Sequence, residues 1–176
     1  MSPVKGLLLT GSVDFSLPIS YVPPQTVKQR VKTALRLYNV TTEKQVEMIN
    51  IDNLLRRYLQ EEQLTEGVLL IFVPHTTAAV TINENGDPDV QRDIINMLNQ
   101  VIPFDGNFHH FEGNSAAHIK SSLIGCQTQV IVRDGLAQLG TWQSVYFCEF
   151  DGPRNRKLWI EHHTTPGHSA APPTQP

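Results

Sequence analysis

The sequence predicts an α+β fold: a single domain with a mostly antiparallel or mixed β-sheet and a few helices. Short apolar strand-like segments recur along the chain, three segments place apolar residues at helical spacing, and hairpin-type turn signals join the last strands. A chain of 176 residues is long enough for one domain with a sizeable core. We place this domain at residues 28–163, between an N-terminal extension (1–27) and a proline-rich tail (164–176) that we expect to be disordered.

The first predicted elements are two strands and a helix. Side chains alternate over residues 35–40 and, more briefly, over 45–48, which predicts two strands. Asp52 is suited to cap a helix, which we expect to end near Gly67. The apolar face of this helix carries Leu54, Leu55, Tyr58 and Leu59.

A continuous apolar run at residues 68–73 predicts a central strand that is buried on both faces. Pro74 interrupts the run, because proline lacks the N–H group that a sheet ladder uses. Residues 77–83 have the composition of the same strand resuming. The sequence therefore predicts one long, interrupted strand here.

A second helix begins at Asp87 and Pro88, since a capping carboxylate is followed by proline at the first helical position. Its apolar residues recur at helical spacing, and Pro103 ends it. These apolar residues are Val90, Ile94, Met97, Leu98 and Val101.

A third, short helix starts at Asn114 or Ser115 and stops at Gly125. We expect Ala116, Ile119 and Leu123 to point inward from it. The remainder is strand and turn, with strands at 128–132, 141–150 and 156–162 and turn signals at Asp134-Gly135 and 151–155.

Composition excludes several classes of function. The formal net charge of −3 and the scattered basic residues argue against a nucleic-acid partner. No apolar run approaches the roughly 20 residues that span a bilayer, so we expect no membrane insertion. Cys126 and Cys148 lie in apolar strand-like segments without CxxC spacing, which predicts buried free thiols and a cytoplasmic protein. Serines and threonines near the N-terminus, with few acidic residues, leave organelle targeting open.

Three histidines are candidate metal ligands. His75 follows a buried strand, His110 lies in a loop, and His118 lies one turn into the third helix. If the three imidazoles converge, they leave the fourth corner of a tetrahedron to water, which is the arrangement of a catalytic zinc site. Their spacing matches no compact zinc motif, and each histidine alone is also consistent with a hydrogen-bonded structural role.

Two carboxylates are candidate catalytic groups. Asp93 lies at the margin of the apolar stripe of the second helix, where it either orients a histidine or acts as a base. An exposed position on the helix flank is the alternative. Glu84 lies in a turn after a strand, which does not by itself require a catalytic role.

Phosphate has three candidate binding positions. The start of the third helix at Ser115 offers free N–H groups, Lys120 lies nearby, and Arg154 and Arg156 bracket a turn. Trp142 is suited either to stack on a heterocycle or to fill the core. The chain has no P-loop, no GxGxxG and no nucleophile elbow.

Several long segments, in this order, resemble the YjbQ-like family of secondary thiamine-phosphate synthases. The segments read HTTAAVTINEN, DPDVQRD, DGNFHH, AAHIKSSLIG and DGLAQLGTWQSVYFCEFDGPR. The resemblance covers residues 33–161 and implies an α+β domain, usually trimeric, with its recurring polar residues in a cleft near subunit contacts.

The resemblance also implies roles for individual residues. Carried over by position, the recurring histidines are His75, His110 and His118, with His109 at a position that is usually not histidine, and the recurring acids are Glu84 and Asp93. The expected substrate-binding residues are Thr76, Asn85, Ser115, Lys120, Trp142, Gln143, Arg154 and Arg156. The implied cofactor is a divalent metal ion, zinc being our prediction, and the implied assembly is a homotrimer.

The implied activity joins a hydroxymethylpyrimidine diphosphate to a thiazole phosphate, with release of pyrophosphate. It requires a cation near the diphosphate, polar groups for the thiazole phosphate and a surface for an aromatic ring. Two alternatives remain open on the residues alone. One is a metal-dependent hydrolase of a small phosphorylated or amide substrate, and the other is a non-enzymatic trimeric binding protein.

Overall fold

The computed structural model describes residues 35–164. The strands are β1 (Arg36–Thr41), β2 (Glu47–Asn50), β3 (Gly67–Phe72), β4 (Ala78–Glu84), β5 (Gln127–Arg133), β6 (Leu136–Ala137), β7 (Gln143–Glu149) and β8 (Asn155–His163). The helices are α1 (Asp52–Glu61), α2 (Pro88–Val101) and α3 (Ser115–Ile124). The predicted extension (1–27), the start of the predicted domain (28–34) and the predicted tail beyond Thr164 lie outside the described residues.

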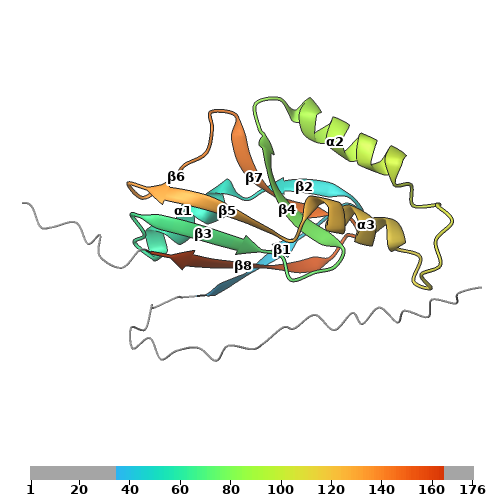
Figure 1. Ribbon diagram of the computed structural model, residues 1–176, viewed down its shortest axis with the longest axis horizontal. Helices are drawn as coiled ribbons and strands as arrows, with labels where there is room; N and C mark the ends of the chain where they lie inside the picture. Colours follow the sequence, from blue (N-terminus) through green and yellow to red (C-terminus); the bar gives the residue numbers. More distant parts are fainter. Residues whose placement is uncertain (1–34, 165–176) are drawn as a thin grey trace, which may run out of the picture. The chain divides into compact units, whose positions relative to one another are not determined.

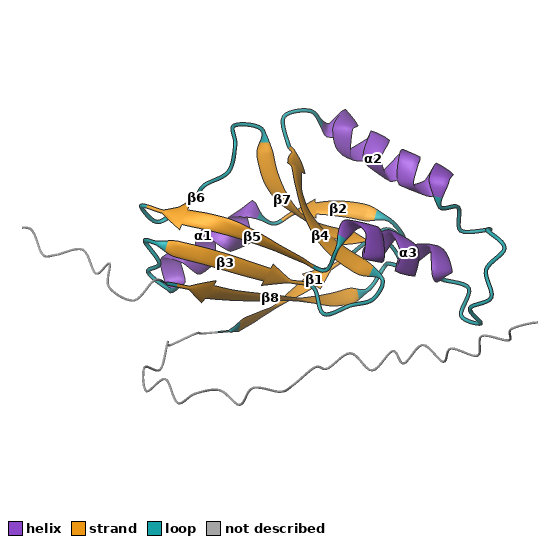
Figure 2. Ribbon diagram, in the orientation of Figure 1, coloured by secondary structure: helices purple, strands orange, loops and turns teal. Residues whose placement is uncertain are grey.

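The strands form two sheets (Figure 1). One sheet has the order β1-β8-β3-β5-β6 and the other the order β2-β7-β4. Every pairing within them is antiparallel. Figure 2 shows α2 and α3 on the side of the three-stranded sheet. The predicted α+β class is therefore confirmed.

The main core lies between the two sheets and α1. The five-stranded sheet contributes one face of each strand, as the buried Leu69, Ile71 and Ile160 illustrate. A second cluster on the other face of the three-stranded sheet contains Ala117 of α3 and Tyr146 of β7. The three-stranded sheet thus packs on both faces, which places α3 and its residues above β4 and β7.

The predicted single interrupted strand is wrong, because β3 and β4 belong to different sheets. β3 pairs with β5 and β8, whereas β4 pairs with β7. The segment from Pro74 to Thr77 carries the chain from one sheet to the other. Burial of β3 on both faces is also wrong, since Leu70 and Phe72 are partly exposed on the uncovered face of the sheet.

The start of α2 is confirmed: Asp87 Oδ1 accepts a hydrogen bond from Asp89 N at 2.8 Å, and Pro88 occupies the first helical position. The predicted cap of α1 is wrong. Asp52 is already inside the helix, and its Oδ1 accepts from Val145 N at 2.9 Å, which ties α1 to β7 instead. α1 also ends at Glu61, earlier than expected.

The predicted inward face of α3 is correct only at Ala116. Ile119 and Leu123 are exposed, at 37% and 68%, while the buried face consists of Ala116, Ala117, Lys120 and Ser121. Small side chains allow α3 to lie close on β4, and the Ser121 hydroxyl donates to Ala78 O at 2.7 Å. The face of α3 that carries small side chains is therefore the buried one, although larger apolar residues lie on the exposed face.

Two further expectations concern the burial of the cysteines and membrane-spanning segments. Cys148 is buried as expected, but Cys126 is exposed, so the prediction of two buried thiols is half wrong. Within residues 35–164, no helix is both long and apolar enough to cross a membrane.

Candidate functional site

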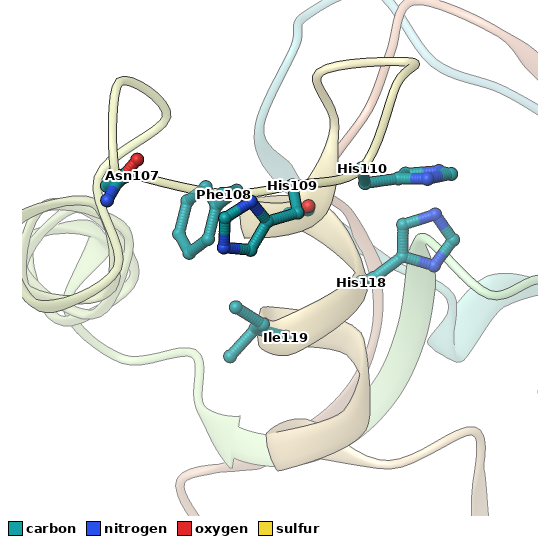
Figure 3. A pocket seen from close by; sticks show the side chains of 7 residues that line it. Asn107, Phe108, His109, His110, His118 and Ile119 are labelled. Atoms are coloured by element: carbon teal, nitrogen blue, oxygen red, sulfur yellow. The ribbon is translucent and has the colours of Figure 1, made fainter.

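A pocket of about 450 Å³ lies at the first turns of α3, and the loop that precedes the helix forms its opposite wall (Figure 3). The loop follows α2 and carries adjacent aromatic and imidazole side chains. Seven residues line the pocket: Asn107, Phe108, His109, His110, Ser115, His118 and Ile119.

Two of the three predicted imidazoles meet in this pocket. The rings of His110 and His118 lie edge to face, with their centroids 5.4 Å apart. His109 lies over Ile119 and Phe108, away from this pair (Figure 3). The loop thus presents one imidazole of the adjacent pair to His118 and the other to the apolar part of the pocket.

The first turn of α3 contributes backbone donors. Asn114 precedes the helix, and its side chain makes no capping hydrogen bond. The first N–H groups of a helix carry the positive end of its dipole. In α3, Ala117 N donates to Asn114 O at 3.0 Å, which leaves the N–H groups of Ser115 and Ala116 without a partner inside the helix. Ser115 adds a hydroxyl in the pocket wall. These groups together favour an anion such as phosphate.

His75 does not line this pocket. Its Nε2 accepts a hydrogen bond from Lys157 N at 2.8 Å, which places the proton of the neutral ring on Nδ1. Burial, and then the nearby Arg156 charge, lowers the pKa of His75. The His75 ring thus accepts the hydrogen bond of a β8 backbone N–H group at a position past the end of the neighbouring strand β3. Thr76, the next residue, is exposed.

Within the described residues, no three His, Cys, Asp or Glu side chains are grouped to hold a metal ion. His110 and His118 are one short of the three protein ligands typical of a catalytic zinc site. Glu112 is an acidic neighbour of His110, with its Oε2 3.9 Å from His110 Nε2.

Arg156 is buried, contrary to the expected phosphate-binding role at the surface. Its guanidinium makes a bidentate ion pair with Glu149 and donates to Thr77 Oγ1 at 2.9 Å. Glu149 is fully buried and also accepts from Thr42 and from two backbone N–H groups. Sequence reasoning missed Glu149, although a glutamate inside the apolar segment VYFCEF needs a partner.

Arg154 lies beside the start of α3. Its Nε donates to Asp151 O at 2.6 Å and its Nη2 to Asp151 Oδ2 at 2.7 Å. The same Oδ2 accepts from Asn114 Nδ2 at 3.0 Å. Asp151 therefore joins a half-exposed arginine to the residue that immediately precedes the pocket helix.

Glu84, Asn85, Trp142 and Gln143 form a second group, beside the N-terminus of α2. Asn85 N donates to Trp142 O at 2.8 Å, and the Tyr146 hydroxyl lies 2.8 Å from Asn85 Oδ1. Trp142 is 66% exposed, so it does not fill the core. Gln143 Oε1 accepts from Gly140 N, which closes the turn. Since α2 has 14 residues, it extends about 21 Å from this group toward the histidine loop.

The last two predicted residues lie outside both groups. Asp93 is exposed on α2, as the alternative interpretation expected. Lys120 is fully buried, its Nζ donates to Asn99 Oδ1 at 2.6 Å, and it lies 3.8 Å from the ring centroid of Phe104. Burial lowers the pKa of Lys120. This ammonium group thus holds α2 and α3 together and does not line the pocket.

The family described as UPF0047 protein YjbQ-like matches residues 36–165. A UPF0047 protein of Methanocaldococcus jannaschii is 49% identical over 124 residues, which cover 70% of this chain and 90% of that protein. The UPF0047 protein YugU of Bacillus subtilis is 48% identical over 128 residues, covering 72% and 97%. The chain belongs to the YjbQ-like UPF0047 family.

Two solved structures, one of them of a YjbQ/UPF0047 protein, have the same fold. A crystal structure of an uncharacterised YjbQ/UPF0047 protein from Clostridium acetobutylicum matches with a TM-score of 0.71 and 47% identity, over 73% of this chain and 99% of that one. A hypothetical protein of Aeropyrum pernix matches with a TM-score of 0.71 and 30% identity, covering 75% and 99%. The YjbQ-like domain therefore accounts for nearly the whole length of these relatives.

Proposed function

We propose that the pocket at the start of α3 binds a phosphorylated small molecule, and that the protein is a transferase of the thiamine-phosphate-synthase type. The observation that carries this proposal is the meeting of His110 and His118 beside the free N-terminus of α3. The family resemblance supplies the reaction. A hydroxymethylpyrimidine diphosphate is joined to a thiazole phosphate, and pyrophosphate leaves.

The pocket offers a group for each requirement of this reaction. The first N–H groups of α3 and the Ser115 hydroxyl suit phosphate oxygens. The imidazoles of His110 and His118 suit proton transfer or hydrogen bonding to a leaving diphosphate. Phe108 and Ile119 supply an apolar wall against which a heterocycle can pack.

A divalent metal ion, zinc in our prediction, fits this donor set in part. His110 and His118 would hold it together with oxygens of the substrate phosphate, because two imidazoles alone leave coordination positions open. When bound, such an ion neutralises charge on the diphosphate and makes it a better leaving group.

The direct test incubates the purified protein with both precursors, with and without Zn²⁺ or Mg²⁺, and measures thiamine phosphate and pyrophosphate. We expect formation of both products, and their loss in His110→Ala and His118→Ala. His163→Ala, at an exposed position of β8, is the matched control and retains activity. Absence of both products with every metal overturns the synthase proposal.

The same assay separates the two alternative functions. Release of phosphate from either precursor alone would identify a metal-dependent hydrolase. If no chemistry occurs but the wild-type protein binds the thiazole phosphate in the α3 pocket, the non-enzymatic binding protein becomes the better description.

We also propose assembly as a homotrimer, as the resemblance implies. The apolar residues of α2 support it, because none of the residues of this helix is fully buried in a single chain. Met97 and Val101 are 58% and 69% exposed. Sedimentation equilibrium should give the mass of three chains for the wild type and a smaller mass for Val101→Glu. A monomeric wild type contradicts the proposal.

A cytoplasmic location is likewise a proposal. Cys126 and Cys148 are both free thiols, which suits a reducing compartment. Cell fractionation with an antibody against the protein tests it, and recovery in an organelle or the medium contradicts it.

A further inference from the structure

The last residue of β7, Glu149, is a buried carboxylate that fixes the backbone of the following turn around Asp151. Glu149 Oε1 accepts from Phe150 N at 3.0 Å and from Asp151 N at 2.9 Å. Its Oε2 accepts from Arg156 Nε at 2.6 Å and from Thr42 Oγ1 at 3.1 Å. Both oxygens are thus engaged from several directions, so the backbone N–H of Asp151 is held at a fixed point.

The Asp151 side chain faces two groups at the start of α3. Its Oδ2 accepts from Arg154 Nη2 and from Asn114 Nδ2, and its carbonyl accepts from Arg154 Nε. An ionised carboxylate only accepts hydrogen bonds, so the Asn114 amide must present its nitrogen here. The amide oxygen is then turned away, and it is buried without a hydrogen-bond donor.

Arg154 needs this support to serve as a phosphate ligand. Its side chain is 52% exposed, and a long free arginine loses much rotamer freedom when it binds an anion. Two hydrogen bonds from the guanidinium to one residue fix its orientation in advance. Nη1 has no hydrogen-bond partner among the described residues and stays available for an anion at the helix N-terminus.

We infer that Asp151, beside the α3 pocket, is a positioning residue: it orients Arg154 so that a phosphate group binds between Arg154 and the first turn of the helix. This inference rests on the proposed phosphate-binding function of the pocket. It explains how Arg154, an expected substrate-binding residue, would be held for that site, adds Asp151 as its positioning residue, and assigns Glu149 the role of holding Asp151 in place.

The test is titration of the protein with inorganic phosphate by calorimetry, for wild type, Asp151→Ala, Arg154→Ala and the double variant. We expect Asp151→Ala to weaken phosphate binding about tenfold, the effect of losing a hydrogen bond to a charged group. In the Arg154→Ala background, Asp151→Ala should add less than about twofold, because its effect acts through Arg154.

Tighter phosphate binding by Asp151→Ala would contradict the inference most clearly. If Asp151 only neutralises Arg154, then Asp151→Ala frees the guanidinium and phosphate binds more tightly. Unchanged binding, or an equal loss in the Arg154→Ala background, also overturns the inference. Failure of the wild type to bind phosphate overturns the proposed function first, and is thereby distinguished from failure of the positioning role.

Two measurements guard against a merely structural effect. Thermal unfolding reports whether each variant folds, and Asp151→Asn, which keeps an acceptor but loses the charge, replaces Asp151→Ala if that variant does not fold. Exchange of the Arg154 Nη2 protons, which donate to the Asp151 carboxylate, should be faster in the variant than in the wild type when followed by NMR without phosphate. An unchanged exchange rate contradicts the orienting role directly.

Discussion

Two polar clusters lie close to each other in this molecule and differ in whether their hydrogen-bonding groups are used. In the Glu149–Arg156 cluster, the carboxylate, the guanidinium and two threonine hydroxyls are buried and bonded to one another. In the α3 pocket, His110, His118 and Ser115 border an open space at the start of a helix whose preceding residue makes no side-chain capping hydrogen bond. A saturated cluster holds the fold, whereas an unsaturated one can bind a ligand.

The largest expected effect breaks the saturated cluster. Glu149→Gln leaves the buried Arg156 without its counter-charge, which typically costs about 3–5 kcal/mol of unfolding free energy. Urea unfolding measures it, with Glu66→Gln at an exposed loop position as the control. A loss as small as that of the control would mean that this cluster does not hold the fold.

The next effect removes a group of the open cluster. His118→Ala should lower the rate of thiamine phosphate formation by roughly 10²-fold or more if the imidazole transfers a proton. The unfolding free energy should change by less than about 1 kcal/mol, because the side chain is partly exposed and its ring makes no hydrogen bond within the described residues. A large loss of stability with unchanged turnover would show that His118 holds the fold and does not take part in the reaction.

The structure also shows which features can be predicted from the sequence and which cannot. Local signals placed the start of α2 at Asp87 and the turn at Asp134-Gly135 correctly, because capping and positive φ are local requirements. The separation of β3 from β4 was not predictable locally. It depends on which distant strand each one pairs with, and β4 pairs with β7.

The same limit applies to the site. Of the three predicted histidines, His110 and His118 are eight residues apart along one loop and helix, and they meet. His75 finds its partner at Lys157, which is 82 positions away, through the pairing of strands. Lys120 was expected to bind phosphate, but only the packing of α2 on α3 shows that it is buried against Asn99.

A smaller effect concerns His75, at the edge of the saturated cluster. Because burial lowers its pKa, the folded protein binds fewer protons at this ring than the unfolded chain does. Its contribution to stability is therefore present above about pH 6.5, the unfolded value, and is lost as the pH falls through the lower folded pKa.

Urea unfolding between pH 5 and pH 8 measures this contribution. We expect His75→Gln to flatten the fall in stability on the acid side relative to the wild type. His163→Gln, at an exposed position of the five-stranded sheet, is the control variant. Equal slopes in wild type and His75→Gln would show that the ring titrates as if it were exposed.

The smallest effect concerns the group at the other end of α2. A Cβ atom at Gly86 would lie 2.6 Å from the Trp142 ring, so Gly86→Ala should displace the indole. The cost should be below about 1 kcal/mol, because the ring is exposed and free to move. The tryptophan fluorescence spectrum reports the displacement of the Trp142 indole. The Trp142→Phe variant gives the signal of Trp159 alone for comparison. An unchanged spectrum in Gly86→Ala contradicts the contact.

The central claim, that unsatisfied groups at the start of α3 form a phosphate site, is tested most directly by NMR of the histidine rings during titration with inorganic phosphate. We predict saturable shifts of the His110 and His118 ring signals, with His75 and His163 unmoved at constant pH. No shift at His110 and His118, or equal shifts at all four rings, would contradict it.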